Sequence, residues 1–164
     1  IENVRAGYRT AFYPYYPEYG NYVSLDHQLP DGRSLAFDAS YEGNRFNWLT
    51  LLAPLPPGVA KLPKDRARWN QRRGFAQQRK VLWNDKQSRR FASFIVGKKT
   101  IIATGDVGND QKIPFLASID LETGKNNWVH RLPAQPIKGG ASIDSLGRIL
   151  VTLADGTAVC FEKK

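Results

Sequence analysis

Side chains that could carry acid–base or metal chemistry are few in this sequence. The two histidines, His27 and His130, stand far apart, and Asp26 adjoins only the first of them. An imidazole and a carboxylate can bind a metal ion or exchange protons when their spacing brings them together. The sequence offers no such spacing, so we predict a structural or surface role for both histidines.

Two other features could in principle bind a metal ion or carry catalytic chemistry. The stretch from Gly105 to Asp110 has three oxygen-bearing side chains, but it does not follow the EF-hand spacing, so we expect an ordinary loop. The single cysteine, Cys160, can form neither an internal disulfide nor a multi-cysteine metal site, and we expect it to be a buried apolar side chain. The sequence also shows no phosphate-binding glycine loop and no nucleophile elbow. We therefore assign no catalytic residue and no metal site.

Binding chemistry is easier to find, because the net charge of +9 falls within one segment of the 164-residue chain. Residues 61–90 contain eleven basic and two acidic residues, and the remainder is balanced. Arginine binds phosphate and carboxylate groups in a bidentate manner, and aromatic rings stack on bases. The binding candidates from this segment are Arg68, Trp69, Arg72, Arg73, Arg79, Lys80, Arg89 and Arg90. We favour a solvated insertion, then another protein or an anionic surface as partner, and lastly nucleic acid.

An aromatic cluster near the N-terminus is the second candidate. Six of the seven tyrosines lie between Tyr8 and Tyr22, and Pro14 and Pro17 disfavour a helix or central strand there. Tyrosines on a rigid loop are good anchors for sugars or partner proteins. The candidates are Tyr13, Tyr15, Tyr16 and Tyr19. The alternative is a loop that uses these rings as its own local core.

The elements that position these groups are predicted to be strands. Short runs of β-branched and aromatic residues, bounded by Gly, Asp or Asn, follow one another through the second half of the chain. The runs are 91–96, 100–104, 115–119, 127–130, 140–143, 148–153 and 157–161. Such runs with minimal connections predict an antiparallel meander.

Three tryptophans suggest a repeat. Trp48, Trp83 and Trp128 are separated by 35 and 45 residues, and four-stranded propeller blades recur at roughly 40–50 residues. A large aromatic residue on an outer strand suits a blade, because it packs against the neighbouring blade. The alternative is three unrelated core tryptophans in a sandwich.

The segment from Leu116 to Trp128 resembles the repeat of PQQ-like, or quinoprotein-type, β-propellers. The matching residues include Asp120, Gly124 and Trp128, and the closing hairpin at Asp155 and Gly156 is similar to a last blade. The resemblance implies an all-β fold, a partial propeller of four-stranded antiparallel blades with a basic insertion. Many such propellers bind no quinone, so the motif does not specify an activity.

This resemblance implies three regions. Residues 1–53 form a degenerate blade with an aromatic-rich N-terminal loop, 54–90 a proline-rich and then basic insertion ending in a blade strand, and 91–164 about one complete and one three-stranded blade. The chain begins at Ile1 and lacks methionine, so we expect a processed or truncated polypeptide, the C-terminal part of a larger propeller. Remaining blades of its own chain or a partner chain would complete it. No stretch is long and apolar enough for a transmembrane helix.

The function implied by the resemblance is a non-catalytic protein-interaction or scaffold module of an exported bacterial protein. The setting would be periplasmic or at the cell surface, and the module would need no cofactor. The alternative is a fragment of a PQQ-dependent alcohol or sugar dehydrogenase, which would require PQQ and calcium. A third possibility is nucleic-acid or polyanion binding through the basic segment.

Overall fold

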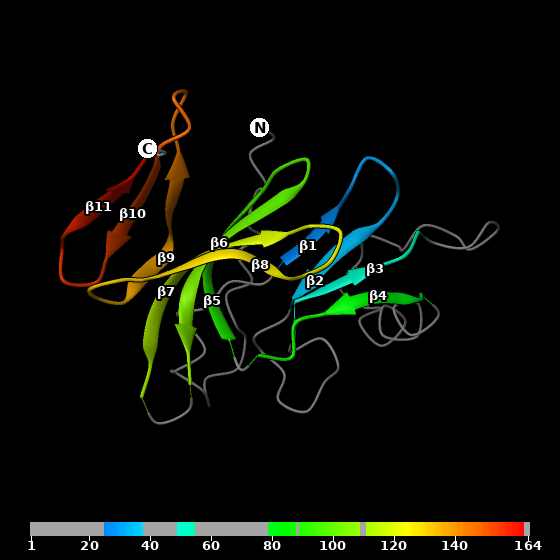
Figure 1. Ribbon diagram of the computed structural model, residues 1–164, viewed down its shortest axis with the longest axis horizontal. Helices are drawn as coiled ribbons and strands as arrows, with labels where there is room; N and C mark the ends of the chain where they lie inside the picture. The colour runs from blue at the N-terminus through cyan, green and yellow to red at the C-terminus, as the bar shows by residue number, and fades with distance from the viewer. Residues whose placement is uncertain (1–24, 38–48, 55–78, 88, 109–110, 163–164) are drawn as a thin grey trace, which may run out of the picture.

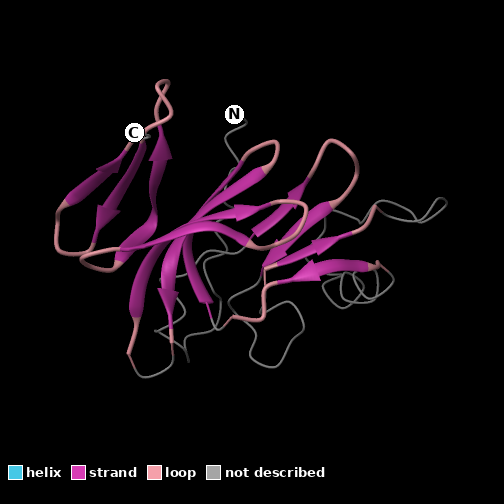
Figure 2. Cartoon of the chain, viewed as in Figure 1, coloured by secondary structure: helices cyan, strands magenta, loops and turns pink. Residues whose placement is uncertain are grey.

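The computed structural model describes residues 25–37, 49–54, 79–87, 89–108 and 111–162. These residues form eleven strands and no helix (Figure 2). The strands belong to three antiparallel sheets, each in an order that follows the chain. The expected all-β class is confirmed.

The first sheet contains four short strands and one long interruption. Its strands are β1 (Leu25–Gln28), β2 (Ser34–Phe37), β3 (Thr50–Leu52) and β4 (Val81–Asn84). The chain leaves the sheet after β3 and returns at β4, so residues 53–80, which include most of the basic segment, interrupt a single sheet. The Ala53 amide donates to the Lys80 carbonyl at 2.8 Å, which holds the two ends of this excursion side by side.

The second and third sheets account for the rest of the described chain. The second sheet consists of β5 (Arg89–Val96), β6 (Thr100–Val107), β7 (Ile113–Asp120) and β8 (Asn126–Arg131). The third consists of β9 (Pro136–Ile143), β10 (Ile149–Leu153) and β11 (Ala158–Phe161). Tight turns keep these sheets in chain order: the Asp144 carboxylate, for example, accepts bonds from the amides of Leu146 and Arg148.

The second sheet lies between the first sheet, which begins in blue in Figure 1, and the third sheet, which ends in red. One of its faces meets the first sheet in a core rich in phenylalanine, which includes Phe37, Phe91, Phe94 and Phe115. The opposite face meets the third sheet in a mainly aliphatic core, which includes Ile102, Leu116, Val151 and Leu153. Because both faces are covered, β6 and β7 are apolar along most of their length.

Register shifts occur in four strand pairs, β3–β4, β5–β6, β7–β8 and β9–β10. β5 has a bulge between Phe91 and Ser93 where it pairs with β6. In the third sheet Val151 pairs with Ala141 but Leu153 pairs with Pro136, so β9 carries extra residues over 137–140. A bulge bends its strand and increases the local twist.

The structure corrects two expectations. Gly105 and Asp106 lie in β6 and not in a loop. The glycine allows the paired strand β5 to approach closely at its bulge, because a Cβ at Gly105 would overlap the Arg90 carbonyl. Cys160 is exposed and not buried, because it points away from the second sheet. The three described sheets do not close into a ring, so a propeller is not shown. Trp48 lies outside the described residues.

Candidate functional site

Trp83 joins the outer strand of the first sheet to a turn of the second. Its indole Nε1 donates to the Leu121 carbonyl at 2.9 Å. The ring covers Gly124, where an added Cβ would lie 2.6 Å from two ring carbons. Gly124 also has a φ of +70°, a conformation that glycine adopts without steric cost. Glycine is therefore required there both by the backbone and by the docked indole.

Charged groups hold the same turn. The Asp120 carboxylate accepts bonds from the amide and the hydroxyl of Thr123, both at 2.8 Å, and these bonds lower the pKa of Asp120. The Arg33 guanidinium donates to both carboxylate oxygens of Glu122, at 2.7 and 2.8 Å, and lowers the pKa of Glu122. This bidentate pair connects the β1–β2 turn of the first sheet to the second sheet.

The third tryptophan of the repeat, Trp128, has a different environment. It is partly buried against the aliphatic core, and its ring centroid lies 5.1 Å from that of His130. His130 in turn stacks on Phe161 of β11, with centroids 5.5 Å apart. The glycine of the β10–β11 turn, Gly156, has a φ of +86°, but a Cβ added there would meet no other atom within 4 Å. Within the described part of the chain, no indole covers this turn as Trp83 covers Gly124.

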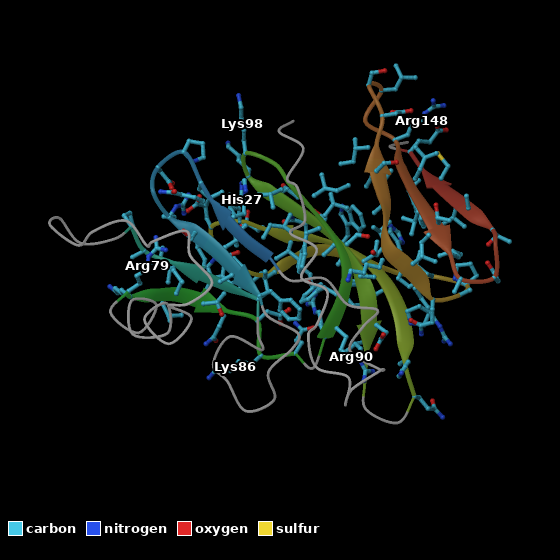
Figure 3. The ribbon with its side chains drawn as sticks, turned by 180° about the vertical axis from the view of Figure 1, so that it is seen from behind. His27, Arg79, Lys86, Arg90, Lys98 and Arg148 are labelled. Carbon is cyan, nitrogen blue, oxygen red and sulfur yellow. The ribbon has the colours of Figure 1, made fainter. Side chains whose placement is uncertain are left out.

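Arg79 binds carbonyl and hydroxyl groups of its own sheet. Its guanidinium donates to the Ala53 carbonyl at 2.8 Å, to Ser34 Oγ at 2.9 Å and to the Gly32 carbonyl at 3.0 Å. These three acceptors lie at or near the ends of β2 and β3. Arg79 thus fastens the chain where it returns from the basic segment into β4 (Figure 3).

Arg89 and Asp85 form a buried ion pair, with Arg89 Nε 3.2 Å from Asp85 Oδ2. Arg89 also donates to the side-chain oxygens of Gln87 and Asn126, and its guanidinium lies 5.5 Å from the centre of the Phe115 ring. Burial raises the pKa of Asp85 and lowers the pKa of Arg89. Removing one partner would leave a buried charge without compensation, so the pair is structural.

Arg90 completes this set of internally bonded arginines. It donates from Nε to Asp106 Oδ1 at 2.6 Å and from Nη2 to the Gly108 carbonyl. Lys80, in contrast, is exposed. The remaining sequence candidates lie outside the described residues: Arg68, Trp69, Arg72, Arg73, Tyr13, Tyr15, Tyr16 and Tyr19.

The third sheet presents one exposed face, which we call the open face. Burial alternates along β10, where Ile149, Val151 and Leu153 face the second sheet and the residues between them are exposed. Leu150 pairs with Ser142 and Cys160, and Thr152 pairs with Ala158, so these side chains share the other side of the sheet. The open face consists of Ser142, Leu150, Thr152, Ala158 and Cys160, all exposed and none charged.

Only part of this arrangement is visible in the sequence. The repeat singles out Trp83, Asp120 and Gly124, which the structure brings to one turn. The open face leaves no such signal, because β10 reads Ile-Leu-Val-Thr-Leu and only its burial alternates. The Arg33–Glu122 pair leaves no such signal, because its partners are 89 residues apart and no local pattern connects them.

Comparisons with protein-family models, with curated proteins and with solved structures found no significant match. Among the described residues, no three His, Cys, Asp or Glu side chains are grouped so that they could hold a metal ion. The same part of the chain contains no helix with the length and apolarity that crossing a membrane requires.

Proposed function

We propose that this chain is a non-catalytic protein-interaction or scaffold module, the C-terminal part of a larger exported β-propeller. The observation that carries this proposal is the open face of the third sheet. Its occupant would be a further antiparallel sheet, supplied by remaining blades of the same polypeptide or by a partner chain. A periplasmic or cell-surface setting follows from the sequence resemblance alone.

Sheet-on-sheet packing within the chain supports this occupant. Both faces of the second sheet and the inner face of the third are covered by another sheet. The open face carries the apolar side chains of Leu150, Ala158 and Cys160 beside the uncharged polar side chains of Ser142 and Thr152, and Arg148 interacts with Cys160 at its margin. An uncharged face that remains exposed is typical of an interaction surface.

The edge of the third sheet supports it as well. β11 is the last strand in its sheet and, among the described strands, pairs only with β10. Its outer side therefore presents backbone amides and carbonyls to another strand. A strand along β11 would complete a four-stranded blade, and a neighbouring sheet over the open face would be the next blade.

The described arginines of the basic segment favour this function over phosphate recognition at their positions. Arg79, Arg89 and Arg90 all bond to acceptors within the protein. Their guanidinium groups hold strands and turns together. This supports the interpretation of the basic segment as an insertion anchored at its ends.

Cys160 provides a direct test, because it is the only cysteine of the chain and lies on the open face. We expect a maleimide to label Cys160 rapidly in the 164-residue chain. In a longer polypeptide that includes further blades, or in a complex with the partner chain, we expect labelling to slow at least about tenfold, because a packed sheet excludes the reagent.

A matched control uses the exposed β9–β10 turn. The variant Ser145→Cys, made in a Cys160→Ser background, places the thiol away from the open face. It should label at the same rate in the short and the complete forms. Equal labelling of Cys160 in both forms would contradict the proposal.

A further inference from the structure

A cavity of about 260 Å³ lies between the second and third sheets, away from the open face. Its walls come from β5, β6 and β9 and from the connections that precede β7, precede β9 and follow β10. Within the described part of the chain, the polar side chains that line it are those of Asp106, Lys112, Gln135 and Lys138. The cavity therefore brings groups from two sheets together at one end of their shared core.

Both walls of the cavity are formed where the strands are irregular. Ala92, inside the β5 bulge, and Gly105 opposite it belong to the lining, as do Ile137 and Lys138 in the extra residues of β9. Gly140 supports this second bulge, because a Cβ there would lie 2.5 Å from Ile137 Cγ1. Bulges are frequent beside functional sites, where they redirect side chains.

The charges around the cavity favour an anion. Asp106 is almost fully buried, and its carboxylate is paired with Arg90 and so is neutralised. Among the described lining residues, the other charged side chains are those of Lys112, directly before β7, and Lys138 in β9. Lys138 already interacts with another group of the protein, so a ligand would share it. The Gln135 amide donates to the Lys112 carbonyl at 3.3 Å and connects the two sheets.

We propose that this cavity binds a compact carboxylate ligand, with Lys112 and Lys138 as its cationic contacts. The volume equals about nine water molecules at about 30 Å³ each, which suits a short dicarboxylate or one acidic side chain. It is smaller than the roughly 300–1,000 Å³ of typical pockets for larger organic ligands. The proposal does not depend on what covers the open face.

The binding experiment is a titration of the ¹⁵N-labelled 164-residue chain with succinate at low salt. The amides of Gly105, Gly139 and Gly140 lie at or beside the cavity wall and should shift in a saturable manner. Gly97 and Gly147 lie in remote turns and should not shift. Absence of saturable shifts at the first three glycines, with succinate and with the peptide described below, overturns the proposal.

Charge-removing variants identify the contacts. Lys112→Gln and Lys138→Gln should each weaken succinate binding by about tenfold, the effect of one lost charge-assisted hydrogen bond. Lys98→Gln is the matched control, since Lys98 is exposed in the β5–β6 turn, at the opposite end of the sheet from Arg90 (Figure 3). Equal binding by all three variants would mean diffuse charge attraction only and would overturn the proposal.

A further variant tests the site without removing either lysine. Ala154 is exposed and lines the cavity. Ala154→Glu adds a competing carboxylate and should abolish succinate binding, whereas Ala154→Gln, which has the same size, should retain it. Equal succinate binding by these two variants would contradict the assignment of the site.

The source of the carboxylate is distinguished by a second titration. The probe is the capped peptide Gly-Asp-Gly, and its control is Gly-Asn-Gly. Binding of succinate alone identifies a free organic acid, and binding of the aspartyl peptide identifies an acidic side chain. Both results support the proposal if binding weakens in Lys112→Gln and Lys138→Gln; binding of the asparagine peptide with equal affinity would overturn it.

Discussion

The two junctions between sheets are formed differently, although both place one antiparallel sheet against another. The junction of the first and second sheets has a phenylalanine-rich core, a docked indole and the Arg33–Glu122 pair at its rim. The junction of the second and third sheets has an aliphatic core, a stack of Trp128, His130 and Phe161, and a cavity at one end.

The difference lies in how the space between the sheets is filled. Aromatic rings in edge-to-face contact, such as Phe37 and Phe91 with centroids 5.0 Å apart, fill the first junction. In the second junction the cavity lies beside the bulges of β5 and β9, and polar groups are among its lining residues. We therefore expect the first junction to dominate stability and the second to tolerate ligands.

The largest effect is expected from truncating the first core. Phe91→Ala should lower the free energy of unfolding by about 3–5 kcal/mol, because it removes a fully buried ring and leaves a cavity. Leu153→Ala, in the second core, should cost about 2 kcal/mol, the lower end of the range for leucine. Urea denaturation measures both. A larger loss at Leu153 would reverse the proposed ranking of the junctions.

The next effect compares two glycines with positive φ. Gly124→Ala should cost about 3 kcal/mol, because it adds backbone strain and displaces the Trp83 ring. Gly156→Ala should cost only about 1 kcal/mol, since its new methyl group meets no neighbouring atom. Thermal unfolding gives the difference, and tryptophan fluorescence should report displacement in the first variant alone. Equal costs would show that the indole does not contribute.

A smaller effect concerns the indole ring and its hydrogen bond. Trp83→Phe keeps an aromatic ring on β4 but removes the Nε1 donor to the Leu121 carbonyl. We expect a loss of about 1 kcal/mol, the net contribution of one hydrogen bond, measured by urea denaturation. No loss would mean that packing alone fixes the ring.

The smallest effect concerns the Arg33–Glu122 pair at the rim. Because Arg33 lowers the pKa of Glu122, the stabilisation is complete above the ordinary pKa of glutamate and is lost as the pH falls through the lowered value. Glu122→Gln should therefore lower the melting temperature slightly at neutral pH and leave it unchanged at the acid end. High salt should remove the difference. A difference that persists at about 1 M salt, where the screening length is only about 3 Å, would contradict an electrostatic origin.

Local patterns are sufficient to predict most strands of the second and third sheets. Runs such as Thr100–Thr104 combine β-branched residues with short turns, and both signals act within a few residues. The prediction of a loop at Gly105 is wrong, because glycine is required there by the close approach of the paired strand β5. The expected burial of Cys160 is wrong for a similar reason: it depends on which face of the third sheet is covered.

Contacts between sheets cannot be predicted from local sequence patterns. The repeat draws attention to Trp83 and Gly124 separately, but their contact requires the stacking of two sheets. Arg90 belongs with the binding candidates by its charge, whereas its bond to Asp106 makes it part of the fold. Charge along a sequence does not show which cations find partners after folding.

The hydrogen bond that joins the two ends of the insertion, at Ala53 and Lys80, has a practical consequence. Ala53 and Lys80 are joined backbone to backbone, and Arg79 reinforces them from the side. The entropic cost of closing a loop grows only slowly with its length. A shorter linker or a small reporter domain could therefore replace the insertion between Ala53 and Lys80 while the three sheets keep their pairing.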